Sequence, residues 1–266
     1  MNFCTVTTIQ QQPLATLWQP SSLHHGLNVS TFEDSRVAYY IKFIRLKQTF
    51  KASLLTIIDF RLLRQIILEC EKFAYPTLFK SVYLIAFFSF LRLSNLLPHS
   101  IGTFSTLEQL AKGDIFFAPP GLHILVKWSK TLQSRNKVVI LKLPSISDTV
   151  ICPVYHIKQL LKSVPGGQDA PLFQVLCYGR WVPLANNRVR KHLKDVIMSP
   201  KLHNRGITFH TLRKSGASLA FQGQASLQSI KEHGTWSLDT VWRRYIIQNQ
   251  DGSSEVARPL AHLACP

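Results

Sequence analysis

Hydrophobic positions recur with helical spacing over most of the chain, which predicts a largely α-helical protein. The stretch TIIDFRLLRQIILECEKF, residues 56–73, has an apolar helical face and Asp59 in its first turn. The next stretch, YPTLFKSVYLIAFFSFLRLSNLLP, opens at Pro76 and stops at Pro98, with apolar residues on most faces between them. Because a helix that is apolar all round is usually buried, this pattern predicts a central buried helix.

The period then changes from helical to alternating. Residues 121–144, GLHILVKWSKTLQSRNKVVILKLP, contain two runs rich in β-branched residues around a polar turn at Gln133 to Asn136. Two such runs around a turn predict a β-hairpin. The predicted fold class is therefore α+β, mostly α-helical, with one small antiparallel sheet after the central helix.

Helical spacing returns after the hairpin and also precedes the first strong helix. Pro153 opens one of these helices, and residues 185–198 form a basic amphipathic one. The further predicted helices are residues 32–51, 152–164, 185–198, 210–221, 226–234 and 236–248.

The amino-acid composition indicates a folded hydrophobic core and shows a strong positive charge. Of 266 residues, 46% are hydrophobic, which excludes a disordered chain. The chain has 31 Lys and Arg against 14 Asp and Glu, a net charge of +17, which indicates a polyanionic partner such as nucleic acid.

The cysteines and the lengths of the apolar runs indicate whether the protein is of the metal-binding, disulfide-rich or membrane class. The five cysteines are scattered without a CxxC pair, which gives no support to a zinc site or a disulfide framework. The N-terminus lacks the pattern of a signal peptide, and the longest apolar run, Val82 to Leu91, is too short for a membrane span. We expect a soluble, intracellular protein with no membrane partner.

The stretch HTLRKSGASLAF carries the clearest chemical signal. It places His210 and Arg213 one helical turn apart at the head of an apolar helix. A buried arginine is costly unless an anion meets it, and that anion is either a carboxylate of this chain or an external ligand.

Four more residues complete a set suited to phosphate chemistry. Taken singly, each has a structural interpretation: an arginine at a helix end, a lysine near a hairpin turn, and an aromatic pair in the core. Together they supply cations, a proton donor and a nucleophile without a carboxylate cluster for Mg²⁺, as metal-free phosphoryl transfer requires. No cofactor is expected. The candidate catalytic residues are Arg92, Lys130, His210, Arg213, Trp236 and Tyr245.

The position of the lysine is open at this point. Lys127 is an alternative to Lys130, because both lie near the turn of the hairpin. Residues three apart on a strand face opposite sides, so only one of the two is expected to point into a site.

The stretches FLRLSNLLP, WSKTLQ, HTLRKSGAS and GTWSLDTVWRRY resemble those of the tyrosine recombinases, or phage-type integrases. The residues of these motifs are most similar to those of the eukaryotic branch carried by DIRS-like and Crypton-type mobile elements. The resemblance covers residues 53–247. It implies the recombinase catalytic-core fold, double-stranded DNA as partner, assembly as a tetramer on DNA, and a nuclear location.

The resemblance also implies a role for each candidate. Tyr245 would attack a phosphodiester and form a 3′-phosphotyrosyl bond, and Lys130 would protonate the leaving 5′ oxygen. His210 would assist proton transfer.

The remaining candidates would act on the phosphate itself. Arg92 and Arg213 would hold its non-bridging oxygens, and Trp236 would hydrogen-bond the phosphate and buttress the site.

The resemblance divides the chain into three parts. Residues 51–250 correspond to the catalytic domain, and residues 251–266 form a tail. Residues 1–50 are expected to be a partial N-terminal helical segment and linker, so the DNA clamp of the family is expected to be truncated.

Residues 186–194, NNRVRKHLK, are a candidate DNA-binding patch, without an assigned base-reading code. Three alternatives to recombination stay open: a catalytically inactive DNA-binding remnant or domesticated module, a type IB topoisomerase-like relaxing enzyme, and an RNA-binding protein, although no RNA-binding module is recognisable. The candidate DNA contacts are Arg188, Arg190, Lys191 and Lys194.

Overall fold

A computed structural model describes residues 57–119, 121–128, 138–202, 206–236 and Leu260, and the structural statements below concern these residues. The chain divides into two units, residues 1–50 and 51–266, and every described residue lies in the second. The helix predicted at residues 32–51 and the part of the last predicted helix after Trp236 lie outside the described residues.

The first two described helices form the centre of the fold. Helix α2 spans Phe60–Glu69, and its N-cap residue is Asp59, whose side chain accepts a hydrogen bond of 2.7 Å from the backbone N–H of Leu62. Such a cap satisfies one of the orphan donors at the helix start. Helix α3, Pro76–Ser89, is buried from Leu78 to its end, which confirms the central buried helix.

The central helix is shorter than the sequence predicted. It ends at Ser89, because Phe90 adopts a left-handed backbone conformation with φ of 54°, and a separate short helix, α4, spans Leu93–Leu96. A bulky residue at positive φ is strained and needs compensating contacts. The Phe90 ring is fully buried and packs against His233 and Trp236, so tertiary packing overrides local helix propensity here.

The predicted hairpin is confirmed, and it has a third strand. Strands β2 (Gly121–Val126) and β3 (Val139–Pro144) pair antiparallel from Gly121↔Pro144 to Val126↔Val139. Strand β1 (Ile115–Ala118) pairs with β2, so the order is β1-β2-β3. A four-residue strand carries too little periodicity to be recognised in sequence.

A second, two-stranded hairpin was missed altogether. Strands β4 (Gln174–Cys177) and β5 (Arg180–Pro183) are joined by Tyr178 and Gly179, both with positive φ. A two-residue connection with positive φ matches the right-handed twist of its strands. Asn-Gly and Asp-Gly are the usual signals for such a turn, and Tyr-Gly is not among them.

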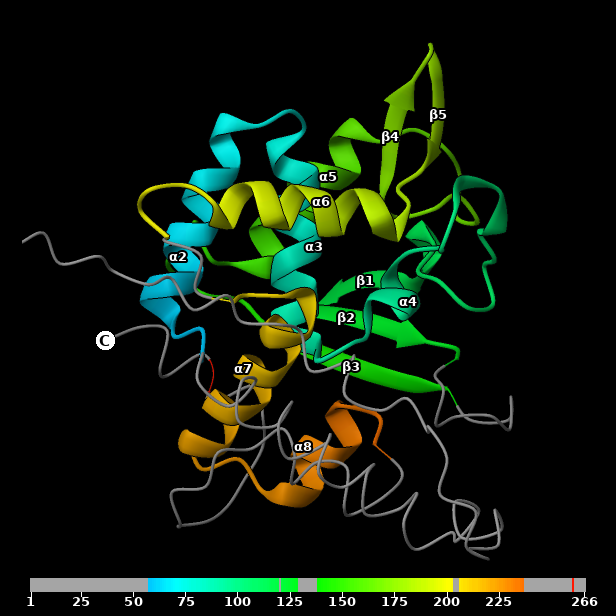
Figure 1. Ribbon diagram of the computed structural model, residues 1–266. Coiled ribbons are helices and arrows are strands. Elements are labelled where there is room, and N and C mark those ends of the chain that lie inside the picture. Colours follow the sequence, from blue (N-terminus) through cyan, green and yellow to red (C-terminus); the bar gives the residue numbers. More distant parts are fainter. Residues whose placement is uncertain (1–56, 120, 129–137, 203–205, 237–259, 261–266) are drawn as a thin grey trace, which may run out of the picture. The chain divides into compact units, whose positions relative to one another are not determined.

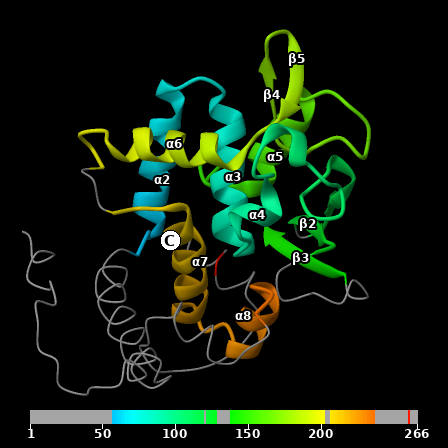
Figure 2. The ribbon, with the colours of Figure 1, turned by 45° about the vertical axis from the view of Figure 1, so that its right-hand side comes forward.

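Helices from the second half of the chain surround α3 (Figure 1). In Figures 1 and 2, α6 crosses over α2 and α3, while α7 lies below α6 and packs against α3. Short 3₁₀ turns span Cys70–Lys72, Ile101–Thr103 and Lys112–Asp114. The helices are α5 (Pro153–Ser163), α6 (Asn186–Ile197), α7 (Phe209–Gln222) and α8 (Leu227–His233), as the sequence predicted for these stretches.

An aromatic cluster fixes α6 on α3. His192 of α6 stacks on Phe79 with a centroid distance of 3.5 Å, and its Nδ1 lies 2.7 Å from the hydroxyl of Tyr83. Phe73 packs edge-on against the same imidazole. Burial disfavours the charged imidazolium and lowers the pKa of His192 to about 4.

This buried histidine predicts a loss of stability in acid. Below pH 6.5 the unfolded chain takes up a proton at this imidazole and the folded chain does not, so the free energy of unfolding falls as the pH falls toward 4. We expect His192 to contribute about 2–3 kcal/mol of this fall between pH 7 and pH 4. Chemical denaturation across this pH range should show a shallower fall for His192→Phe. The exposed-residue control His99→Gln should follow the wild type, and equal slopes for all three would contradict the prediction.

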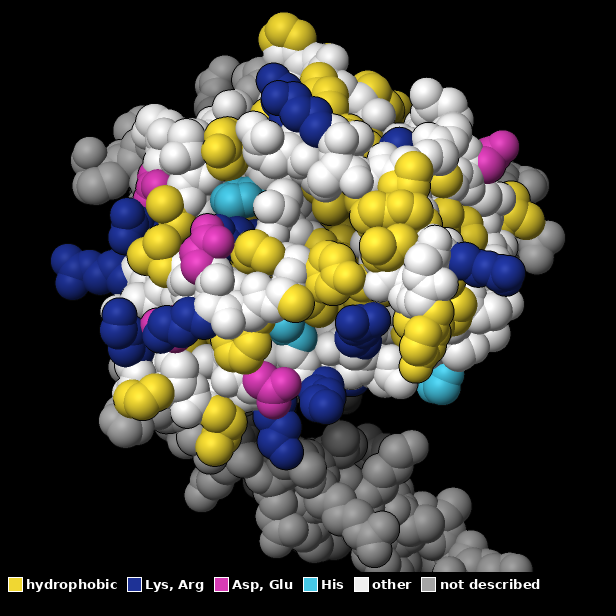
Figure 3. Space-filling view, turned by 90° about the horizontal axis from the view of Figure 1, so that it is seen from above, with side chains coloured by type: hydrophobic (Ala, Val, Ile, Leu, Met, Phe, Trp, Pro, Cys, Tyr) yellow, Lys and Arg dark blue, Asp and Glu magenta, His cyan; other side chains and the backbone are white. Residues whose placement is uncertain are grey.

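The surface outside the core is mixed. On the face seen from above in Figure 3, apolar side chains form broad areas among separate Lys, Arg, Asp and Glu side chains. The Lys and Arg side chains of the described residues therefore do not form one continuous patch on that face. Among the described helices, none is both long and apolar enough to cross a membrane.

Candidate active site

Arg213 is the best-defined member of the candidate site. Helix α7 begins after Thr208, whose side chain caps the backbone N–H of Thr211, and this start places Arg213 in the second turn. Arg213 is only 2% exposed, and its Nη2 donates a hydrogen bond of 2.8 Å to the carbonyl of Gly234. Its guanidinium also lies 4.8 Å from the ring centroid of Trp236. These two contacts fix the plane of the guanidinium, as cation–π contact and a directed hydrogen bond do in general.

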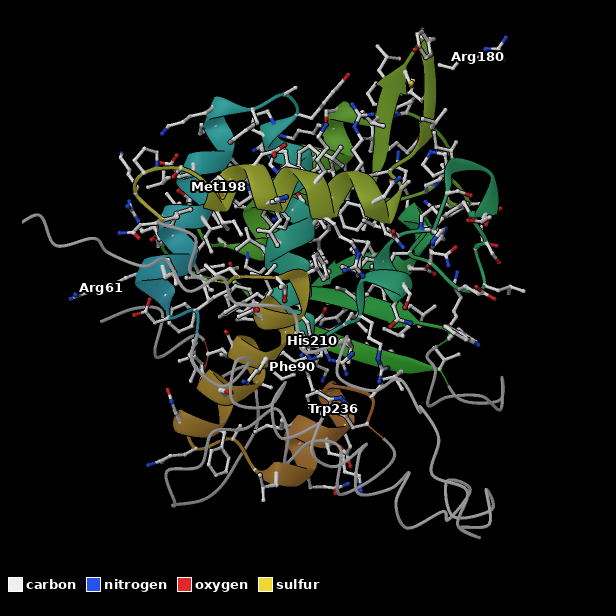
Figure 4. All side chains as sticks on the ribbon, viewed as in Figure 1. Arg61, Phe90, Arg180, Met198, His210 and Trp236 are labelled. Atoms are coloured by element: carbon white, nitrogen blue, oxygen red, sulfur yellow. The ribbon has the colours of Figure 1, made fainter. Side chains whose placement is uncertain are left out.

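Trp236 follows the end of α8 and packs against Phe90, the residue that follows the end of α3. Its ring stacks against Phe90 at a centroid distance of 6.4 Å, and its backbone N–H donates to the carbonyl of Lys231 at 2.9 Å. His233 packs on the same Phe90 ring, and its Nε2 lies 2.8 Å from the carbonyl of Phe88. Figure 4 shows His210, Phe90 and Trp236 gathered in one region beside α7 and α8. The strained residue Phe90 thus forms part of the support for Trp236.

Arg92 lies directly after this break. It is the N-cap residue of α4 rather than a residue near the end of the central helix, which corrects the sequence prediction. Its backbone is extended and its side chain is half-buried, with Nη1 buried and without a hydrogen-bond partner among the described residues. A buried cationic donor is costly to leave unbonded, and a bound anion would satisfy it.

His210 is surrounded by positive charge. It keeps an exposed edge, yet its pKa lies below the usual 6.5 because of partial desolvation and the charges of Arg213, Lys214 and Arg92. All three cations are therefore close enough to His210 to act on its protonation. The neutral imidazole is favoured near pH 7, and in that form one ring nitrogen can accept a proton.

Lys214 was not selected from the sequence. It is 5% exposed, and burial lowers its pKa. It lies four residues after His210, so the two share one face of α7. That spacing was a usable signal, because it places a third cation beside the His210 and Arg213 pair.

The two remaining candidates, Lys130 and Tyr245, lie outside the described residues, so their roles stay predictions. Lys127 is described, and its Nζ lies 2.8 Å from Oδ1 of the buried Asp114. Within the described ranges, no group of three or more His, Cys, Asp or Glu side chains is arranged to hold a metal ion.

The candidate DNA contacts all lie on the outer side of α6. Val189, His192, Leu193, Val196 and Ile197 are buried on its inner side. The four cationic side chains lie on the solvent-facing side of α6, opposite the buried residues, so none of them enters the core. The exposed cations are Arg188, Arg190, Lys191 and Lys194.

The fold of this chain is similar to the folds of solved recombinase structures. Two structures of the XerH site-specific recombinase align with this chain at a TM-score of 0.51 and 20% identity. One is a pre-cleavage complex with difH substrate, and the other is a post-cleavage complex with palindromic difH substrate. Each alignment covers 71% of this chain and 49% of the XerH chain, so the match spans about half of XerH. A lambda integrase (75–356) dimer bound to a COC′ core site aligns at a TM-score of 0.49 and 16% identity, over 75% of this chain and 62% of that one.

No model of a known protein family and no curated protein matches the sequence. The architecture is nevertheless that of the tyrosine recombinase catalytic core, with a buried central helix, a small antiparallel sheet and further helices packed around them. The predicted fold class is confirmed.

Proposed function

We propose that this chain is a tyrosine recombinase, an enzyme that cleaves and rejoins DNA strands through a covalent bond between DNA and Tyr245. The observation that carries the proposal is the fixed, buried guanidinium of Arg213 within the recombinase fold, at a place where Arg92, Arg213 and Lys214 are near enough to His210 to lower its pKa. A cluster of partly buried cations suits a phosphodiester, whose charge increases as it is attacked. The buried Nη1 of Arg92 supports a ligand that accepts hydrogen bonds.

In the proposed reaction, the phenolic oxygen of Tyr245 attacks the scissile phosphorus, and the bond from phosphorus to the 5′ oxygen breaks. Lys130 gives a proton to the departing 5′ oxygen. Neutral His210 assists removal of the phenolic proton. The phosphodiester energy is kept in the 3′-phosphotyrosyl bond, so a free 5′-hydroxyl can reverse the reaction without ATP.

The guanidiniums act on the oxygens that do not leave. Arg213 is held in plane by Gly234 and Trp236, and it donates to one non-bridging oxygen in the proposed complex. Arg92 donates to the other. Because Arg213 is fixed before the substrate binds, little reorganisation of its guanidinium accompanies the charge build-up.

The strand polarity of cleavage tests this proposal. A supercoiled plasmid library with a randomised insert is incubated with the protein in EDTA and quenched with SDS. The expected products carry protein on their 3′ ends and free 5′-hydroxyls, which polynucleotide kinase labels without prior phosphatase treatment. Protein attached to 5′ ends, or cleavage that requires Mg²⁺, would contradict the proposed reaction.

The outer face of α6 is proposed to contact the phosphate backbone. We expect Lys191→Ala to weaken DNA binding about equally on different sequences and to reduce the slope of log affinity against log salt by about one. Fluorescence anisotropy at several salt concentrations measures both quantities. Lys158→Ala removes an exposed lysine from α5 and is the matched control. An unchanged salt slope for Lys191→Ala would remove this lysine from the interface.

Several broader features belong to the same proposal. The sequence resemblance to DIRS-like and Crypton-type elements supports a role in integration or excision of a mobile element, with a nuclear location. The XerH site-specific recombinase structures are complexes with difH substrates, which supports double-stranded DNA as the partner here. Assembly as a tetramer on DNA, and the division into residues 1–50, 51–250 and 251–266, are proposed on the resemblance.

A further inference from the structure

The chain that leaves strand β2 is held by side chains from two other elements. The pairing of β2 with β3 ends at Val126↔Val139. The side chain of the next residue, Lys127, forms an ion pair of 2.8 Å with Asp114, which ends the 3₁₀ turn before β1. The carbonyl of the residue after it, Trp128, accepts a hydrogen bond of 2.9 Å from Nδ2 of Asn95 on α4. The backbone therefore leaves the sheet in a direction set by Asn95 and Asp114.

Both anchoring side chains are buried. Asn95 and Asp114 are each 3% exposed. The second carboxylate oxygen of Asp114 accepts a hydrogen bond of 2.9 Å from the backbone N–H of Ala111, so both of its oxygens are engaged. Breaking either anchor would leave a buried polar group unbonded, which costs about 1–3 kcal/mol. The two contacts are consequently expected to persist in the folded protein.

Asn95 also connects this point to the candidate phosphate-binding arginine. Arg92 is the N-cap residue of α4, and its carbonyl accepts a hydrogen bond of 2.9 Å from the backbone N–H of Asn95. One short helix thus carries Arg92 at its start and, one turn later, the amide that holds Trp128. Trp128 precedes Lys130 by two residues in the sequence.

We propose that Asn95 is a positioning residue for strand cleavage: it sets where the segment with Lys130 begins relative to Arg92. Lys127 belongs to the same anchor through Asp114 and is not the proton donor. This inference rests on the proposed function. Asn95 touches neither the phosphate nor the proton. It acts on the step in which the Lys130 ammonium gives a proton to the 5′ oxygen as the phosphorus–oxygen bond breaks.

A substrate with sulfur in place of the leaving 5′ oxygen separates this role from a structural one. A thiolate leaves without protonation, so loss of the proton donor matters little on that substrate. The test uses a duplex with a cleavage site mapped for the wild-type protein in the plasmid library, synthesised with 5′ oxygen or 5′ sulfur at the scissile phosphate. Single-turnover adduct formation is measured at saturating protein.

Asn95→Leu keeps the approximate volume of the side chain and removes its donor. We expect it to slow cleavage of the oxygen substrate about tenfold to hundredfold, since a small misplacement of a reacting group has effects of this size. The rate on the sulfur substrate should stay within about threefold of the wild type, as for Lys130→Ala. Arg92→Lys should be slow on both substrates, because its role does not depend on the leaving group.

Several results would overturn the inference. Equal slowing of Asn95→Leu on both substrates would show a general structural defect, and no slowing on either would show that Asn95 positions nothing. Asn95→Ala provides a second variant if Asn95→Leu does not fold, and melting temperatures are compared for each. Lys127→Arg can keep the ion pair with Asp114, so it should lose much less activity than Lys130→Arg. The opposite order would make Lys127 the donor. If the wild type forms no adduct with any site, the proposed function itself fails, which is a distinct result.

Discussion

Arg213→Lys is expected to lower the rate of strand cleavage about hundredfold at saturating DNA, and Arg213→Ala by about another tenfold. Lysine keeps the charge but lacks the planar fork, so its ammonium cannot reproduce the fixed spacing by which the guanidinium bonds Gly234 and presents a second donor to a phosphate oxygen. The loss should appear in the cleavage rate rather than in DNA affinity, because one phosphate contact among many contributes little to binding. Single-turnover adduct formation and anisotropy measure the two quantities separately.

The control for this prediction is Arg61→Ala. Arg61 is an exposed arginine of α2, and Figure 4 shows it pointing away from the region of His210 and Trp236. This variant should cleave at the wild-type rate. A rate for Arg213→Lys equal to that of the wild type, with an unchanged melting temperature, would show that Arg213 is a structural arginine only.

Gly216→Ala is expected to destabilise the fold by about 2 kcal/mol or more, although alanine is the better helix former by about 1 kcal/mol. A Cβ at position 216 would overlap the carbonyl oxygen of Phe87 and press on the ring of Phe90. Helix α7 would have to move away from α3, which also separates His210 and Arg213 from Arg92. For a protein of this size, the melting temperature should fall by about 4–8 °C, and cleavage should slow with it.

Gly102→Ala is the matched substitution for comparison. Gly102 lies in an exposed 3₁₀ turn, and a Cβ there would have nothing within 4 Å. Thermal unfolding of this variant should stay within about 1 kcal/mol of the wild type. If Gly216→Ala were as stable as Gly102→Ala, the close approach of α7 to α3 would not be the constraint that the structure indicates.

The sequence predicted the elements whose periodicity is long or strongly marked. Among the described residues, helices α2, α3, α5, α6, α7 and α8 and the hairpin of β2 and β3 fall where hydrophobic spacing placed them. The break at Phe90 was not predictable, because nothing local distinguishes Phe90 from the apolar residues before it. Its conformation depends on contacts with His233 and Trp236, which are far away in the sequence.

Some residues of the candidate site could likewise be predicted from the sequence, and others could not. His210 and Arg213 were identified because their spacing on a helix is local. Arg92 and Trp236 were selected as members of a set of residue types suited to phosphate chemistry, and the family resemblance then supplied their roles. Asn95 and Asp114 were missed, because their contacts with Trp128 and Lys127 appear only once the sheet and α4 are folded together. Gly234 was missed for the same reason, since it acts on Arg213 through its backbone carbonyl.

Tyr245 is the proposed point of covalent attachment to DNA. The most direct measurement is mass spectrometry of the SDS-trapped adduct formed in EDTA, after nuclease and protease digestion, with Tyr245→Phe in parallel. The expected result is a peptide that carries a nucleotide remnant on Tyr245 and no adduct in the variant. An adduct that persists in Tyr245→Phe, or salt-sensitive DNA binding by the wild type with no adduct, would contradict the account.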